Sequence, residues 1–192
     1  MNEPTGHAQT DPSKPQADAQ PHLQAPLSRL RPTRLAHWIA MGMGSGLSPW
    51  APGTVGTLWA WVSFLVLQLW LDPHEWLIVM AVATAVGWWA CTETARDMRS
   101  ADPSCIVWDE IVAFWLILLM ISPAGLLEQS LAFVVFRFFD AVKPPPVSWA
   151  DQLFKPRGAT PVSPGWLQGA GILLDDGVAA LCTLLLWAAW RF

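Results

Sequence analysis

The chain is poor in charged residues, which make up only 14% of its 192 positions, against about a quarter in typical soluble domains. It contains no Tyr and no basic stripe of the kind that binds nucleic acid. Its three Cys are an odd set without a CxxC pair, and we expect them to be small buried hydrophobes. Its N-terminal region lacks the basic start, apolar run and small-residue cleavage site of a signal peptide. These absences argue against an ordinary soluble domain and against a nucleic-acid-binding protein.

Apolar residues make up 53% of the chain and are concentrated in blocks, which leave little polar surface to cover a soluble fold. The five blocks cover residues 57–71, 75–91, 107–122, 130–142 and 170–190. Several are shorter than the ~20 residues that a perpendicular span needs, and 130–142 is either a short helix held by its neighbours or one that crosses only in part. Several Trp flank the blocks, as interfacial indoles do. We therefore predict an all-α, polytopic membrane helix bundle with four to five apolar helices.

Residues 1–30 are rich in Pro, Gln, Ala, Asp and Ser, a composition that buries too little surface to offset its ordering entropy. We predict a disordered cytoplasmic tail over residues 1–30 and a membrane-embedded domain over residues 31–192. Lys and Arg precede the first block and occupy alternate connections, whereas the opposite connections contain acidic residues but no Lys or Arg. This bias places the N-terminus and the longer loops in the cytoplasm.

Five carboxylates fall on this same membrane face: Asp109, Glu110, Asp140, Asp175 and Asp176. Asp109 and Glu110 open an apolar helix, where an acidic residue also suits the helix dipole, but capping explains one carboxylate more easily than two. Gathered at one site, the five would repel one another unless a divalent cation lay between them. Mg²⁺ prefers carboxylate oxygens and usually shares its shell with a phosphate. We predict that the five surround such a cation, and a purely structural polar network is the alternative.

Two other segments on this face offer contacts to a phosphate. The stretch GSGLSPWAPGTVGT (44–57) combines backbone N–H groups, Thr54, Thr57 and a following helix N-terminus, although it is not a Walker A loop. The alternative is that Thr54 or Thr57 only caps the helix. Arg137, Asp140 and Lys143 step by three, so they lie near one helix face. Arg137 and Lys143 would bind phosphate oxygens, unless the three residues form an internal ion-pair ladder.

The common covalent routes of phosphoryl chemistry are absent. Asp175-Asp176-Gly-Val does not fit the DxDx[TV] pattern of aspartyl-phosphate enzymes, and Cys91 and Arg96 are one residue too close for CX5R. The paired histidines of common lipid phosphatases and the DGxxAR pattern of CDP-alcohol phosphotransferases are also missing. There remains a metal-activated water that attacks phosphorus, with a second carboxylate accepting the proton.

Four stretches resemble the phosphatidylglycerophosphatase A family of bacterial membrane enzymes, in the order in which that family has them. They are GSGLSPWAPGTVGT (44–57), IVWDEIVAFW (106–115), FRFFDAVKPPPVSWAD (136–151) and GAGILLDD (169–176), within a similarity over most of residues 38–190. The resemblance implies Mg²⁺-dependent hydrolysis of phosphatidylglycerophosphate to phosphatidylglycerol and phosphate at the cytoplasmic face of the inner membrane. It implies metal or acid–base roles for the five carboxylates, and phosphate contacts for Arg137, Lys143 and the Thr54 loop.

The chain departs from the family pattern at two places. Leu167-Gln168-Gly169 stands where the family has a His-Gly-Gly-type link, and Ala113 replaces a Gly. Two other function classes stay open from the residues alone: a small transporter that uses the acidic cluster as its pathway, and a non-catalytic subunit of a lipid-synthesis complex. A transporter would have carboxylates at several depths, whereas these are expected at one face.

Overall fold

The computed structural model describes residues 34–100, 103–153 and 165–191, and every regular element in these ranges is helical. The elements are α1 (Leu35–Ala40), the 3-10 helix η2 (Gly42–Leu47), α2 (Pro52–Leu67), α3 (Pro73–Met98), α4 (Trp108–Ile121), α5 (Leu126–Val142), α6 (Val147–Leu153) and α7 (Trp166–Arg191). The all-α prediction is therefore confirmed for these residues, and the five apolar blocks correspond to α2, α3, α4, α5 and α7. The predicted tail over residues 1–30 lies outside the described residues, as does most of the 152–168 loop.

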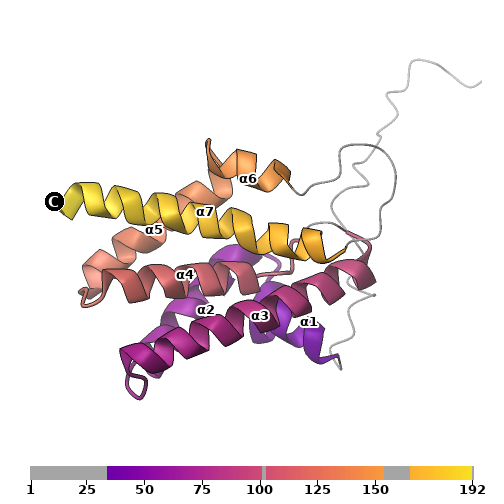
Figure 1. Ribbon diagram of the computed structural model, residues 1–192, viewed down its shortest axis with the longest axis horizontal. Coiled ribbons are helices and arrows are strands. Elements are labelled where there is room, and N and C mark those ends of the chain that lie inside the picture. Colours follow the sequence, from indigo (N-terminus) through magenta and orange to yellow (C-terminus); the bar gives the residue numbers. More distant parts are fainter. Residues whose placement is uncertain (1–33, 101–102, 154–164, 192) are drawn as a thin grey trace, which may run out of the picture.

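Helix α4 is the centre of the bundle and contacts α2, α3, α5 and α7 (Figure 1). Ten of its 14 residues are buried, because apolar side chains follow one another around the whole helix rather than along one stripe. Two of its indoles donate hydrogen bonds to neighbouring helices: Trp108 to the Ala83 carbonyl of α3 and Trp115 to the Ala60 carbonyl of α2, each at 2.9 Å. Such bonds matter in an apolar bundle because no water satisfies a buried indole N–H there.

Two helices are long and apolar enough to cross a membrane, α3 and the Gly169–Arg191 part of α7. Only 33% and 39% of their most apolar stretches are buried inside the protein, which distinguishes them from the core helix of a soluble domain. Helices α2, α4 and α5 contain 16, 14 and 17 residues, fewer than the ~20 of a perpendicular span. A membrane bundle is thus supported by two helices, while the predicted count of four to five is not confirmed.

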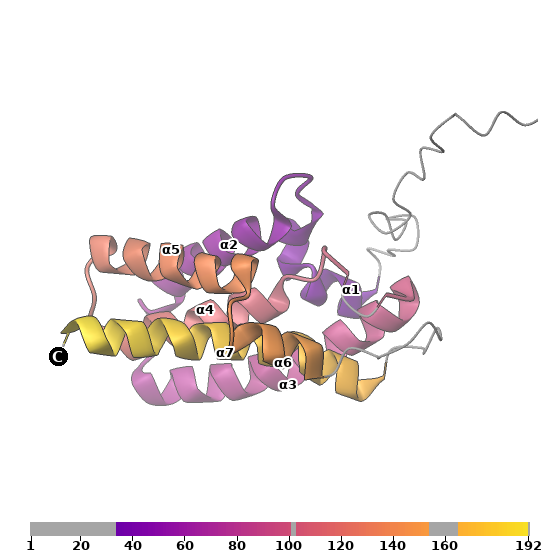
Figure 2. The ribbon, with the colours of Figure 1, turned by 90° about the horizontal axis from the view of Figure 1, so that it is seen from above.

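Successive long helices alternate in direction (Figures 1 and 2). The α2–α3 turn, the α4–α5 turn and the end of α7 lie together at the left of Figure 1. The starts of α2 and α4, the end of α5 and the first half of α7 consequently lie toward the other end of the bundle. These are the parts of the helices that contain the predicted site residues.

Candidate active site

The first turn of α4 contributes Asp109 and Glu110. The helix follows a short turn-containing segment whose last residue, Val107, donates its N–H to the Ala40 carbonyl of α1 at 2.9 Å. Val107 is also the N-cap of α4, and no side chain caps this helix. Asp109 and Glu110 lie inside the first turn, so N-capping does not explain this pair.

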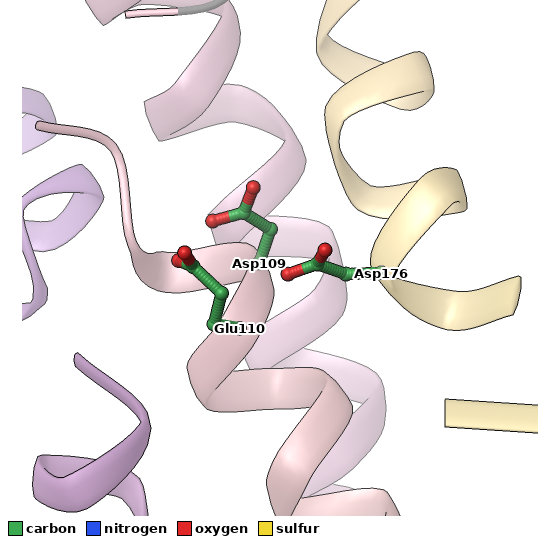
Figure 3. A group of neighbouring side chains, drawn as sticks. All are labelled: Asp109, Glu110 and Asp176. Atoms are coloured by element: carbon green, nitrogen blue, oxygen red, sulfur yellow. The ribbon is translucent and has the colours of Figure 1, made fainter. Parts of the chain in front are cut away.

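Helix α7 brings Asp176 to these two residues (Figure 3). One oxygen from each of Asp109, Glu110 and Asp176 lies within 4.8 Å of the other two. Asp176 is more than two turns inside α7 and only 3% exposed, and Glu110 is 9% exposed. Three carboxylates from two helices therefore lie close together, with Asp176 and Glu110 buried and Asp109 half-buried.

Helix α5 contributes the basic residues. The Arg137 guanidinium forms an ion pair with Asp140 one turn away, and its Nη1 lies 3.7 Å from Glu110 Oε1. Lys143 follows the end of α5 in the left-handed region, with φ 47°, and its Nζ lies 2.5 Å from Asp175 Oδ2 of α7. The Arg137–Asp140 step of the predicted i, i+3 ladder is therefore present, and Lys143 pairs with Asp175 of a different helix.

The start of α2 forms the remaining wall. Thr57 is buried, donates its hydroxyl to the Gly53 carbonyl at 2.8 Å, and lies 3.5 Å from Arg137 Nη1. Thr54 lies in the same first turns, on the α2 helix itself. The alternative that Thr54 or Thr57 caps this helix is wrong: its N-cap is Ala51, without a side-chain cap bond, and Pro52 is its first residue.

Gly53 is the residue of this site that the sequence reasoning did not single out. A Cβ at this position would overlap Glu110 Oε1 and press on the Arg137 guanidinium. Only glycine allows the α2 backbone to approach the two charged groups so closely. The available signal was a Gly directly after a Pro that begins a helix, inside a stretch already expected to contact phosphate.

The carboxylates outnumber the bases in this site. The acidic neighbours of Asp176 include Asp109, Asp140 and Asp175, so all five predicted carboxylates converge on one region. Arg137 and Lys143 are the bases paired with them in the described residues. Among these residues, Glu110 Oε2 and Asp176 Oδ2 are buried without a hydrogen-bond partner. Buried charged oxygens left in this state are costly, and a hard divalent cation would satisfy them.

The thiols near the site fit no catalytic role. Cys105, in the segment before α4, is buried, and burial raises the pKa of its thiol to about 11. It therefore stays protonated at neutral pH, when only a thiolate would act as a nucleophile. Cys91 on α3 is also fully buried. The structure confirms the expected burial for Cys91 and Cys105, whereas Cys182 is only half-buried.

Residues 38–191 match the phosphatidylglycerophosphatase A family. The chain is 34% identical to phosphatidylglycerophosphatase A of Escherichia coli over 160 residues, 83% of this chain and 86% of the relative. It is 32% identical to phosphatidylglycerophosphatase A of Haemophilus influenzae over 167 residues, 87% of this chain and 95% of the relative. A Bacteroides thetaiotaomicron protein named as a candidate phosphatidylinositol-3-phosphatase is 32% identical over 169 residues, 84% and 97% of the two chains. No solved structure matches this chain.

Proposed function

Because the chain belongs to the phosphatidylglycerophosphatase A family, we propose that it is a Mg²⁺-dependent membrane phosphatase that converts phosphatidylglycerophosphate to phosphatidylglycerol and inorganic phosphate. The observation that carries the proposal is the meeting of Asp109, Glu110 and Asp176 beside the Arg137 guanidinium. Oxygen ligands for a hard cation and a fork of N–H donors for a phosphate then lie next to each other.

Asp109, Glu110 and Asp176 would hold the Mg²⁺. They offer only oxygen donors, and two of their buried oxygens lack hydrogen-bond partners in the described residues. Mg²⁺ prefers such oxygens and keeps part of its shell for water and phosphate. When bound, the ion would supply positive charge to the phosphate oxygens and make an attacking water more acidic.

Arg137 and Lys143 would bind the phosphate. Each now pairs with a carboxylate, Arg137 with Asp140 and Lys143 with Asp175. A phosphate monoester carries more negative charge than one carboxylate and would draw both bases toward it. Asp140 and Asp175 then become the candidates for proton transfer. One carboxylate takes the proton of the attacking water, the bond between phosphorus and the glycerol oxygen breaks, and that oxygen leaves with a proton as the alcohol.

We place the protein in the bacterial inner membrane as a multi-pass protein with the site facing the cytoplasm. Helix α3 and the Gly169–Arg191 part of α7 have the length and composition of spans, and most of their apolar stretch is exposed. The site lies at the end of the bundle where α3 ends and α7 begins, near Arg96 and Arg99. Basic residues at that end favour the cytoplasmic side.

The rival functions fit the geometry less well. A transporter needs polar groups at several depths along its pathway, whereas the five carboxylates converge on one region. A non-catalytic subunit has no need for buried carboxylate oxygens that lack partners. The site and the family both favour an enzyme.

The test is phosphate release by the purified full chain from phosphatidylglycerophosphate, with Mg²⁺ and with excess chelator. We expect release that stops with chelator and returns with added Mg²⁺. Chelator-resistant turnover would remove the metal from the mechanism, and no release from this lipid would refute the proposed substrate. Phosphatidylinositol 3-phosphate serves as the counter-substrate, because one relative carries that name. We expect it to be hydrolysed more slowly, since its phosphate is on a bulky ring rather than at the end of a glycerol.

A further inference from the structure

An open apolar groove of about 570 Å³ lies along α2, on the side where η2 packs against it. Its lining includes Trp38 of α1, Met43 of η2, and Val55, Leu58, Trp59 and Val62 of α2. Among the residues that the structure describes, no charged side chain lines it. The volume is within the range of ligand pockets, and the lining excludes a charged ligand group.

The groove and the carboxylate site lie on opposite faces of the same helix. Gly53 and Thr57, four residues apart, face the carboxylates and Arg137. Val55, Leu58 and Val62 are spaced by three and four residues and lie on the reverse face. The first turns of α2 therefore separate a polar site from an apolar channel.

The two features begin at the same level of the bundle. Gly42, which lines the groove, packs so closely against Val107 and Ile111 that an added Cβ would overlap their side chains. Val107 precedes and Ile111 follows the Asp109–Glu110 pair, so this end of the groove is level with the site. From Val55 to Val62 the groove then follows α2 for roughly 10 Å toward the far end of the bundle, at 1.5 Å per residue. An elongated apolar group that starts beside the site and continues into the bilayer would fit this course.

We propose that this groove holds one acyl chain of the lipid substrate, while the headgroup crosses over the N-terminal end of α2 to the phosphate site. The inference rests on the proposed function. Trp38 and Trp59 at the rim are partly exposed, as expected of indoles at headgroup depth. Leu58 and Val62 are exposed inside this mostly apolar groove, and its one polar side chain, Ser45, already donates its hydroxyl to the Gly42 carbonyl at 2.9 Å. An acyl chain would therefore cover the groove without leaving this hydroxyl unpaired. A phosphate at Arg137 and a chain along Val55–Val62 would then anchor the two ends of one lipid.

The kinetic test fills the groove with Leu58→Trp or, as an independent variant, Val62→Trp. Val66→Trp is the matched control, because Val66 is an exposed α2 residue outside the lining. We expect the KM for a lipid with two 18-carbon chains to rise about tenfold relative to the KM for its six-carbon analogue, since several buried CH₂ contacts are lost. Equal changes for the two lipids, or the same change in Val66→Trp, would overturn the proposal.

The second test does not need turnover. Phosphatidylglycerol with a photoreactive group in mid-chain is irradiated with the full chain in phosphatidylcholine vesicles, and labelled peptides are identified by mass spectrometry. We expect labelling concentrated on Met43 and Val55–Val62 and reduced in Leu58→Trp. Uniform labelling of α3 and α7, or cross-linking of two copies through the groove, would overturn the inference. If the groove is labelled but the protein releases no phosphate, the lipid-binding site stands and the proposed reaction is refuted.

Discussion

Carboxylates occupy helix starts at both ends of the bundle, but their surroundings differ. At the far end, Asp72 caps α3 by accepting hydrogen bonds from the His74 and Glu75 N–H groups at 2.8 and 2.9 Å. Glu75 returns the contact by accepting from the Asp72 N–H at 2.9 Å. Glu128 accepts from the Gly125 N–H in the same way at the start of α5. Asp72 and Glu75 are exposed, Glu128 is half-buried, and all three have the partners that a helix N-terminus offers.

At the site end, neither acid of α4 is at the N-cap position, Glu110 is buried between helices, and Asp109 is half-buried. Glu110 and Asp176 each keep one buried oxygen without a hydrogen-bond partner in the described part of the chain. Burial of an unsatisfied carboxylate oxygen destabilises a fold. Position at the start of a helix therefore does not by itself determine the role of an acidic residue. Exposed acids that complete a cap are structural, whereas buried acids from separate helices indicate a ligand.

The largest effect on activity is expected when the acids at the site end are neutralised. Asp109→Asn and Asp176→Asn should each lower phosphate release by at least about 100-fold, because charge stabilisation by a bound metal contributes several kcal/mol. Without Mg²⁺ these variants should unfold at the same or a higher temperature than the parent chain, since a repulsive charge is removed. Glu128→Gln, at the far end, is the control. Normal release by Asp109→Asn would refute the catalytic interpretation.

A smaller effect is expected at the base that contacts both Glu110 and Asp140. Arg137→Lys retains the positive charge but loses the planar fork, so we expect kcat/KM to fall roughly tenfold to 100-fold, mainly through KM. Steady-state kinetics at fixed Mg²⁺ measure the split. Arg96→Lys is the matched control, because Arg96 forms an ion pair with Glu93 one turn earlier on α3. Equal losses of kcat/KM in the two variants would show that Arg137 does not bind the phosphate through its planar guanidinium.

The glycines of the site end allow a steric test. Gly53→Ala would push a methyl group into Glu110 and Arg137, and we expect about a tenfold loss of kcat, because small displacements of catalytic groups are costly. Gly177→Ala is the control, since nothing lies within 4 Å of a Cβ at that position although it adjoins Asp176. A Gly53→Ala enzyme with the parental rate would show that the first turn of α2 can move to accommodate the methyl group without disturbing the site.

At the far end the expected effect is on stability alone. Asp72→Ala removes the α3 cap, so the free energy of unfolding should fall by about 1 kcal/mol. The rate per folded molecule should not change. Thermal unfolding in detergent measures the first quantity and phosphate release the second, and Asp72→Asn, which can still cap, should recover most of the loss. A reduced rate of phosphate release in Asp72→Ala with an unchanged Tm would contradict this prediction, because it would show that the α3 cap affects catalysis.

The sequence predicted the long helices because long apolar runs have few alternatives to a helix in a bilayer. Its boundary at α2 was late, since the Pro and Gly residues of 44–57 suggested a loop, whereas Pro52 in fact begins the helix. The short helices α1, η2 and α6 had no such run and were not predicted. Their positions depend on contacts with other elements, such as those between α1 and α3.

The charged residues of the site could be predicted because they interrupt apolar helices, where an unpaired charge is rare. Which acid pairs with which base could not. Lys143 was expected beside Arg137 and Asp140 on one helix face, but it lies past the end of α5 and pairs with Asp175 of α7. Gly53 escaped notice for the same reason: its importance comes from what packs against it. Spacing along one helix determines a face, whereas partners across helices depend on packing.

The smallest effect is expected at Cys91, which is fully buried on α3 with Asp109, Glu110 and Asp176 as its charged neighbours. A thiolate would be repelled by this acidic surrounding, so the thiol should not act as a nucleophile. Cys91→Ser should keep the phosphate-release rate within about twofold, because Ser is of similar size and its hydroxyl can donate to the helix backbone. Cys91→Ala separates chemistry from packing, since it removes the sulfur without adding a polar group. A loss of 100-fold or more in both variants, with unchanged Tm, would return catalysis to the thiol and reduce the buried carboxylates to a structural network.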